Sequence, residues 1–386
     1  MSDKTPVRAI CAKNSDSDMK IVVTGTRGIP GILGGVETHC EELFPRIASM
    51  GHDVTVIRRS SYIEPANRIA EYKGVKLVDV YAPRRKSIEA IIHTFLAVIK
   101  ARTLKPDILH VHAIGPSLMV PFARLLGMKV VVTNHGPDYD RQKWGRMAKA
   151  VLKAGERFGT RFANRVIVIS SVIADILATR YGRTDTDLIY NGVVRPVKSA
   201  SRSWLGKWGI VDRPYIVAIG RFVKEKGFHD LIEAYCKSGL RSEYSLVIAG
   251  DSDHEDEYSR VLKRQAREAG VVLTGFIKGE PLNQLMSNAS LFVMPSYHEG
   301  LPIALLEAMS YDLDVLVSDI PANRLPVFAS SDFFPTGDTD ALAREMVRKT
   351  KERGTPRSYD LSAYDWDKIA VQTVGVYEKV CSESAH

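Results

Sequence analysis

The stretch "MKIVVTGTRGIPGILGGVETHCEEL" (residues 19–43) joins an apolar run to a glycine-rich turn and then to a helical pattern. A short run rich in valine and isoleucine is typical of a strand buried on both faces of a parallel sheet. Glycines directly after such a strand let the backbone approach another group, often a phosphate, where a helix begins. The stretch therefore predicts the first strand–turn–helix unit of an α/β fold, with a ligand near its turn.

The glycine spacing excludes two nucleotide-binding motifs. A dinucleotide fingerprint needs G-x-G-x-x-G and an acidic residue about 20 positions later. Here the glycines of "GIPGILG" are spaced by threes, and the next strand ends in Arg58 and Arg59. A P-loop ends in Gly-Lys-Ser/Thr, whereas Gly34 and Gly35 are followed by Val-Glu. We expect Gly34 and Gly35 to bring backbone N–H groups close to a diphosphate from outside this domain.

The same strand and helix alternation runs through the chain twice. Strand-like runs begin at Met19, Asp53, Val75, Asp107, Lys129, Arg165 and Asp187, and then at Arg213, Tyr244, Val271, Ser290 and Leu313. Alternation of this kind predicts an α/β fold with two Rossmann-like, doubly wound parallel-sheet domains facing a cleft. The predicted boundaries are a disordered tail (1–18), an N-terminal acceptor domain (19–195), a C-terminal donor domain (196–365) and a helix crossing back (366–386).

Composition narrows the class of protein. The chain has 386 residues, a 45% hydrophobic and 25% charged composition, and a formal net charge of +8. These values fit an ordinary globular protein, and the basic excess favours an anionic partner or simply solubility. Its four cysteines are widely spaced, which argues against a zinc site or a disulfide framework and predicts a cytoplasmic location. There is no nucleic-acid-binding motif.

A second informative stretch is "SYHEGLPIALLEAMSYDLDVLVSD" (residues 296–319). Glu299 and Glu307 are eight residues apart, and Pro302 is well placed near the first turn of a helix. Backbone N–H groups from Gly300 to about Ala304, including those of Leu301 and Ile303, would then form an anion site. Two carboxylates beside such a site suit a nucleotide sugar, although a pair of glutamates is usually a solvated face.

Other candidate residues follow predicted strands. Arg221 and Lys226 come after the first strand of the second half, where cations suit a diphosphate leaving group. His135 ends a strand of the first half and could reach a sugar hydroxyl, directly or through its backbone carbonyl. His112 is a weaker candidate, because a histidine on a strand is more often a packing residue. Surface charges remain the alternative for Arg221 and Lys226.

In this order, these motifs resemble the retaining GT-B glycosyltransferases of glycosyltransferase family 4, from Met19 to about Val380. The opening stretch resembles bacterial rhamnosyl- and hexosyltransferases of cell-surface polysaccharide synthesis. The resemblance implies that Glu299 orients the donor sugar, that Glu307 holds the ribose, and that His135 lies beside the anomeric carbon. It also implies that Arg221 and Lys226 stabilise the diphosphate and that Gly34 and Gly35 leave space for the donor. The pocket for the base would be lined by Gly250, Asp251, Gly275 and Phe276.

The resemblance implies transfer of a hexosyl group from a nucleoside diphosphate sugar to an acceptor hydroxyl, with retention and without a metal or other cofactor. The acceptor would be a glycan or polyprenyl-linked glycan, contacted by Arg27 and His112. The helix expected over residues 82–105 is basic at both ends, which suits peripheral contact with an anionic membrane or a core-facing helix with basic caps.

Three other functions, two enzymatic and one non-enzymatic, are compatible with this fold class. A nucleotide-sugar 2-epimerase would share the two-domain fold and need no acceptor. In an NAD(P)-dependent oxidoreductase, Arg58 and Arg59 could hold a 2′-phosphate. A non-enzymatic sugar-nucleotide sensor would be expected to lack residues such as His135 and Lys226, which are present.

Overall fold

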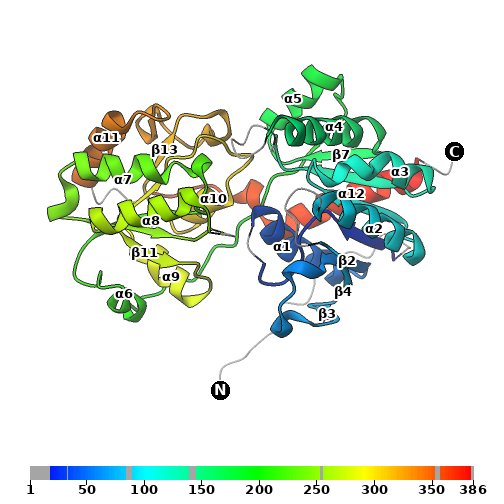
Figure 1. Cartoon of the computed structure of the whole chain (residues 1–386), viewed down its shortest axis with the longest axis horizontal. Helices are drawn as coiled ribbons and strands as arrows, with labels where there is room; N and C mark the ends of the chain where they lie inside the picture. The colour runs from blue at the N-terminus through cyan, green and yellow to red at the C-terminus, as the bar shows by residue number, and fades with distance from the viewer. Residues whose placement is uncertain are drawn as a thin grey trace.

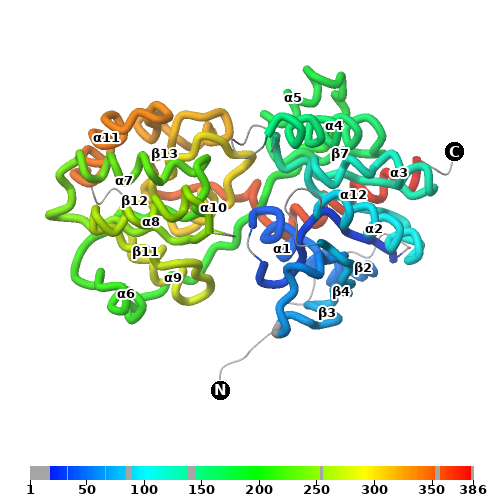
Figure 2. The backbone as a smooth tube through the Cα atoms, viewed as in Figure 1, coloured from blue at the N-terminus to red at the C-terminus, as the bar shows by residue number. Residues whose placement is uncertain are grey.

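The computed structural model describes residues 18–32, 34–83, 89–137, 139, 145–252, 255–352 and 357–383. The chain forms two lobes (Figure 1), and the backbone tube shows the same division (Figure 2). The predicted tail lies outside the described residues except for Asp18, as does the beginning of the basic segment at 84–88. Among the described residues, each helix is too short or too polar to span a bilayer.

The N-terminal lobe contains an eight-stranded sheet in the order β3-β4-β2-β1-β5-β6-β7-β8. All neighbouring strands pair in parallel except β3 with β4. The strands are β1 (Lys20–Thr24), β2 (Asp53–Arg59), β3 (Glu71–Tyr72), β4 (Val75–Val80), β5 (Ile108–His112), β6 (Val130–Asn134), β7 (Arg165–Val168) and β8 (Asp187–Leu188). The chain reverses its direction of winding between β1 and β5, so a ligand crevice is expected beyond their carboxyl ends.

The C-terminal lobe contains a six-stranded parallel sheet in the order β11-β10-β9-β12-β13-β14. Its strands are β9 (Tyr215–Ile219), β10 (Ser245–Ala249), β11 (Val272–Gly275), β12 (Leu291–Met294), β13 (Val315–Ser318) and β14 (Phe333–Phe334). This order has its own winding reversal, between β9 and β12. The predicted pair of doubly wound sheets is confirmed, while the two-residue strands β3 and β14 were not anticipated because they are too short to show a pattern.

Helices cover both sheets. They are α1 (Gly35–Ser49), α2 (Glu89–Leu104), α3 (Val120–Leu125), α4 (Arg146–Phe162), α5 (Ser171–Tyr181), α6 (Ser203–Lys207), α7 (Phe228–Lys237), α8 (Glu257–Ala269), α9 (Glu280–Ser287), α10 (Ile303–Ser310), α11 (Thr339–Lys351) and α12 (Trp366–Ser382). Local chemistry sets several starts: Asp256 and Ser259 form a capping box at α8, and Asp365 accepts from two N–H groups of α12.

The last helix, α12, returns from the C-terminal lobe to the N-terminal one. In Figure 1 it runs, in red, from the boundary between the lobes into the right-hand lobe. Ile369, Val374 and Tyr377 are buried in one apolar cluster with residues of α1 and β1. At its start, Trp366 lies against Gly192, where a Cβ would come within 2.4 Å of the indole. The helix therefore contributes to the core of the opposite lobe.

The glycines of the opening turn divide into two groups. A Cβ on Gly25 would lie 2.2 Å from the His112 carbonyl oxygen, and one on Gly28 would lie 3.0 Å from Arg58 carbons. A Cβ on Gly34, which has a φ of 146°, would lie 2.0 Å from a Glu37 carboxylate oxygen. Gly35, in contrast, has no atom within 4 Å of an added Cβ. Three of these glycines are thus required by the fold, and Gly35 faces open space.

Candidate functional site

The C-terminal lobe places an ion pair at the ends of its central strands. Lys226, in the turn after β9, donates a 2.5 Å hydrogen bond to the carboxylate of Glu299, which follows β12. Both side chains are largely buried, with exposures of 20% and 11%. The turn is possible because Gly227 packs directly on the Pro295 carbonyl, where a Cβ would be 2.1 Å away. Arg221 lies in the same turn after β9.

Helix α10 begins next to this ion pair. Pro302 is its N-cap residue and supplies no side-chain hydrogen bond to the first turn. The positive end of the helix dipole is therefore available to an anion. Leu301, just before the cap, is buried and accepts a 3.1 Å hydrogen bond from the Asn191 side chain. The loop from Gly300 to Ile303 is consequently held by a residue that follows the last strand of the N-terminal sheet.

Glu307 lies one turn further along α10. Burial raises the pKa of its carboxyl from 4.5 to about 7, while Lys278 lowers it and Glu42 of the opposite lobe raises it. A carboxyl with this pKa exchanges protons near neutral pH, so its charge responds to a ligand that donates hydrogen bonds to it.

The ends of β10 and β11 form the third part of this lobe's site. Gly250 packs on the Gly220 carbonyl, where a Cβ would come within 1.9 Å, so a side chain cannot be accommodated there. Asp251 forms a 2.8 Å ion pair with Lys263. Phe276 exposes 44% of its surface directly after β11. A nearby cavity of about 390 Å³ is lined by Phe222, Gly250, Asp251, Lys263, Arg267, Val271, Leu273 and Gly275.

The N-terminal lobe presents histidines instead of charged pairs. His112 ends β5, His135 follows β6, and the His112 Nδ1 and His135 Nε2 atoms are 3.0 Å apart. Burial lowers the pKa of both rings well below 6.5, and the neighbouring histidines lower it further. Both imidazoles are therefore neutral at pH 7. His112 is fully buried behind His135, so in this conformation it contacts its neighbour and not the solvent.

The two lobes touch at two glycines. Gly136, beside His135, lies so close to Gly300 that an added Cβ would be 3.4 Å from the Gly300 Cα. A Cβ on Gly300 would lie 2.3 Å from the His135 carbonyl oxygen. The structure thus brings His135 next to the loop that carries Glu299, whereas Gly250, Asp251 and Phe276 lie at the other strands of the C-terminal sheet.

Arg58 and Arg59 do not form the phosphate site that the oxidoreductase alternative requires. Arg58 is 1% exposed; it donates to the Asp79 carboxylate and to backbone carbonyls of residues 29, 67 and 69. Arg59 pairs with Glu89 at 3.3 Å. The Arg58 guanidinium holds the opening loop to nearby segments and that of Arg59 pairs with α2, so both are committed to internal contacts, which argues against that alternative. Arg27, predicted to contact an acceptor, lies over the Tyr62 ring.

Sequence reasoning missed His39 and Asn191. His39, on α1, lies 2.9 Å from Asn191 and packs its ring against both His112 and His135. A signal for His39 was present, because it is four residues after Gly35 and so lies on the same face of α1. Asn191 had no such signal, since its position between the lobes depends on the tertiary structure.

Comparison with known proteins covers most of the chain. The sequence pattern of Glycosyltransferase Family 4 matches residues 33–195, and that of Glycosyl transferases group 1 matches residues 201–364. An uncharacterized glycosyltransferase of Methanocaldococcus jannaschii is 26% identical, over 93% of this chain and 98% of its own length. A Bacillus subtilis glycosyltransferase, to which a role in teichuronic acid biosynthesis has been assigned but not established, is 26% identical. The match covers 74% of this chain and 76% of the length of that protein.

Solved structures share the two-lobe arrangement. Sucrose-phosphate synthase from Thermosynechococcus elongatus has a TM-score of 0.78 at 19% identity, covering 94% of this chain and 99% of its own. Anabaena HepE in complex with UDP-glucose has a TM-score of 0.69 at 18% identity, covering 95% of this chain and 99% of its own. At these identities the similarity establishes the fold.

Proposed function

Because this chain belongs to glycosyltransferase family 4 and is a GT-B glycosyltransferase, we propose that it transfers a hexosyl group from a nucleoside diphosphate sugar to an acceptor hydroxyl, with retention at the anomeric carbon. The observation that carries this proposal is the position of His135 directly across from the Glu299 loop and the start of α10. The relative HepE, which has the same fold, has been solved with UDP-glucose.

In this proposal the C-terminal lobe stabilises the leaving diphosphate. Lys226, Arg221 and the N-terminus of α10 supply positive charge where negative charge develops. Glu299 already accepts a hydrogen bond from Lys226, so its carboxylate is held in place to receive hydroxyls of the donor sugar. Glu307, with its pKa raised to about 7, would accept hydrogen bonds from the ribose. In the same proposal, Phe276, whose ring is 44% exposed, stacks on the base.

The N-terminal lobe completes the site without adding charge. The His135 carbonyl lies against Gly300, which places its partial negative charge near the position proposed for the anomeric carbon. Retaining hydrolases use two close carboxylates, one of them as a nucleophile. In this chain Glu299 is paired with Lys226, so we favour reaction on one face, with a leaving phosphate oxygen taking the acceptor proton and no metal taking part. Contact between the lobes would keep water from the donor.

We propose that the acceptor is a polyprenyl-linked glycan at an anionic membrane surface, within polysaccharide biosynthesis. On α2, Ile91, Phe95 and Ile99 are each at least 36% exposed and follow one face of the helix, and Leu125 of α3 is 83% exposed. Phe95 stacks on Phe122 of α3 at 5.3 Å, which joins the two helices into one surface. Exposed basic residues lie at the C-terminal end of α2 and on α3: Lys100, Arg102, Lys105 and Arg124. Exposed apolar side chains on helices that also carry exposed cations suit an anionic lipid surface.

The donor is tested by thermal shift with UDP-, GDP- and dTDP-sugars, followed by transfer assays with the donor that binds. A nucleotide that binds the folded state raises the melting temperature. The anomeric configuration of the product, measured by NMR, is expected to match that of the donor. No shift and no transfer with any of these donors would contradict the proposal, and an inverted product would contradict retention.

The membrane surface is tested with vesicles containing about one third anionic lipid. The F95S and L125S variants are expected to lose sedimentation with these vesicles while keeping donor binding. V371S, at a 59% exposed valine of α12, is the matched control. Unchanged sedimentation of F95S and L125S would overturn the membrane assignment without affecting the transferase proposal.

A further inference from the structure

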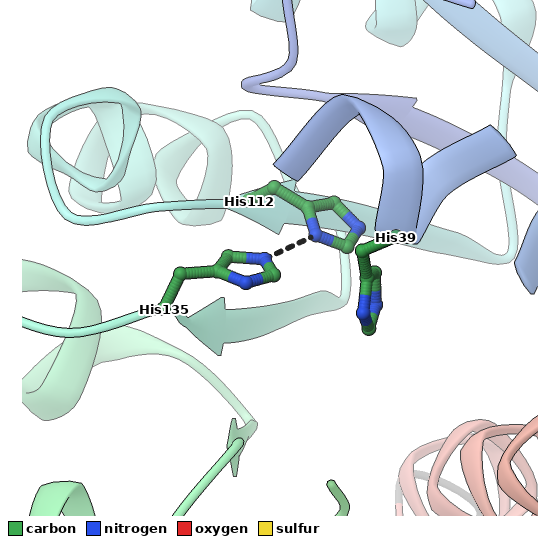
Figure 3. Close-up of side chains that lie close together, drawn as sticks. All are labelled: His39, His112 and His135. Carbon is green, nitrogen blue, oxygen red and sulfur yellow. Dashed lines mark hydrogen bonds between the residues drawn. The ribbon is translucent and has the colours of Figure 1, made fainter. Parts of the chain in front are cut away.

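Three histidines converge at the surface where the N-terminal lobe meets the C-terminal one (Figure 3). His39 comes from α1, His112 from the end of β5, and His135 from the segment after β6. One nitrogen from each ring can be chosen so that all three lie within 4.8 Å of one another. His39 and His112 lie on packed elements of the lobe and His135 follows directly after β6, so the fold brings the three rings together.

The proton on His39 can be located from its partner. Asn191 donates through Nδ2 to the Leu301 carbonyl, which leaves its Oδ1 facing His39 Nδ1 at 2.9 Å. An amide oxygen only accepts hydrogen bonds, so His39 Nδ1 carries the proton. In the neutral ring, His39 Nε2 is then a bare lone pair.

Two of these ring nitrogens are buried without a partner. Neither His39 Nε2 nor His112 Nε2 has a hydrogen-bond partner among the described residues, and the two side chains are 3% and 0% exposed. An unsatisfied buried polar group costs about 1–3 kcal/mol. By contrast, the adjacent His110 uses both nitrogens, bonding to Tyr377 at 2.6 Å and Thr133 at 2.7 Å. The bare lone pair of His39 Nε2 therefore points to a ligand that accepts lone pairs, and His112 can offer its Nδ1 to the same ligand in place of its 3.0 Å contact with His135.

We infer that His39, His112 and His135 form a binding site for a divalent transition-metal ion such as Zn²⁺. Neutral imidazole nitrogens are preferred ligands of Zn²⁺, and the ligating ring commonly donates its other N–H to an oxygen, as His39 does to Asn191. Zn–N bonds of about 2.0–2.1 Å place tetrahedral nitrogens about 3.3 Å apart, so each ring would move by less than about 1 Å. Binding would replace the hydrogen bond between His112 and His135.

Three protein ligands leave one coordination position open, at the lobe boundary. If His135 lies beside the anomeric carbon, as the proposed function has it, a metal ion bound through His135 would occupy space needed by the donor sugar. The ion would therefore inhibit transfer by competing with the donor, which is compatible with a reaction that needs no metal. This consequence rests on the proposed function, whereas metal binding itself does not.

The binding site is tested by calorimetric titration of Zn²⁺ into the untagged, chelator-treated full chain. We expect one site per chain, with affinity at least 100-fold weaker in H39Q and about 10- to 100-fold weaker in N191A, which removes the partner that orients His39. H229Q is the matched control, because His229 lies in the other lobe and bonds to Tyr258. Absence of a stoichiometric site, or equal affinity in H39Q and wild type, would overturn the inference.

Co²⁺ gives a readout that does not depend on any variant folding. Bound to this site, it should give the intense visible absorption of tetrahedral coordination; weak, octahedral-type absorption would contradict the proposed ligand set. Inhibition is measured separately, by comparing each protein with its own zinc-free rate. Zn²⁺ is expected to raise the KM for the donor in wild type and H229Q but not in H39Q. If Zn²⁺ binds at one site per chain but does not compete with the donor, the inferred inhibition is wrong and the metal site stands. If the chain has no transferase activity, the titration alone decides whether the metal site exists.

Discussion

The two lobes contribute opposite kinds of chemistry to one boundary. The C-terminal lobe offers the Lys226–Glu299 ion pair, Arg221, the uncapped start of α10 and a carboxyl at Glu307. The N-terminal lobe offers neutral histidines and backbone groups, because burial keeps its imidazoles uncharged. Both lobes use the same doubly wound sheet, so the difference comes from the side chains at the strand ends. This arrangement suits an anionic donor that is bound by the charged groups of the C-terminal lobe and enclosed by the neutral groups of the N-terminal lobe.

The largest effect is expected from removing charge in the C-terminal lobe. K226A and E299A should each lower kcat by roughly 100- to 1,000-fold, because transition-state charge loses a fixed partner. Initial rates of product formation measure this, and melting temperatures report whether the fold survives. K237A is the control, since Lys237 pairs with Glu233 and Asp340 at the surface, away from the lobe boundary. Turnover close to wild type in both site variants would show that the charged lobe is not the catalytic one.

A second test separates the lobes while leaving their charges intact. In G300A the new methyl group would lie 2.3 Å from the His135 carbonyl oxygen, so the two lobes must move apart. A displacement of about 1 Å can lower a rate by about 100-fold, so kcat/KM should fall by that order. Small-angle scattering should show a larger radius of gyration than in wild type. A fully active G300A would mean that close contact between the lobes is unnecessary for transfer.

A third test compares adjacent glycines of the neutral lobe. G34A should lower the melting temperature, since Gly34 has a φ of 146° and no room for a Cβ beside Glu37. G35A should leave the melting temperature unchanged but raise the donor KM about tenfold, because the added methyl group would occupy space that the donor needs. Thermal denaturation and donor kinetics on both variants check the pair. An unchanged KM in G35A would remove Gly35 from the donor site.

The smallest effect concerns pH and Glu307. Its pKa is raised from 4.5 to about 7, so between these pH values the folded state binds more protons than the unfolded state. The free energy of unfolding contributed by this group therefore falls as pH rises from 4.5 through 7. E307Q cannot ionise, so its melting temperature relative to wild type should be higher at pH 8 than at pH 5. Hydrogen bonds lower the pKa of Glu280 below 4.5, so its carboxyl is ionised in both states across this range, and E280Q serves as a control that should show no trend between pH 5 and pH 8.

Much of the fold could be predicted from periodicity. The runs that begin at Met19 and Arg213 start the two sheets, and every expected strand is present, because burial on both faces leaves continuous apolar runs. Residues at strand ends were also open to prediction, since parallel strands bring their carboxyl ends to one edge. That reasoning placed His135 and Glu299 on facing edges of the two lobes. It could not show that Lys226 pairs with Glu299, because the two are 73 residues apart.

The family, the pair of sheets and the residue types at the strand ends could be inferred from local sequence patterns. The roles of individual residues depend on contacts that form only in the folded chain. The tertiary structure assigned Gly25, Gly28 and Gly34 to packing, left Gly35 facing open space, and committed Arg58 to internal hydrogen bonds. It also brought His39 beside His112 and His135. The physical reason is that strand order and helix packing set contacts between distant segments, and neither is encoded in the period of any one segment.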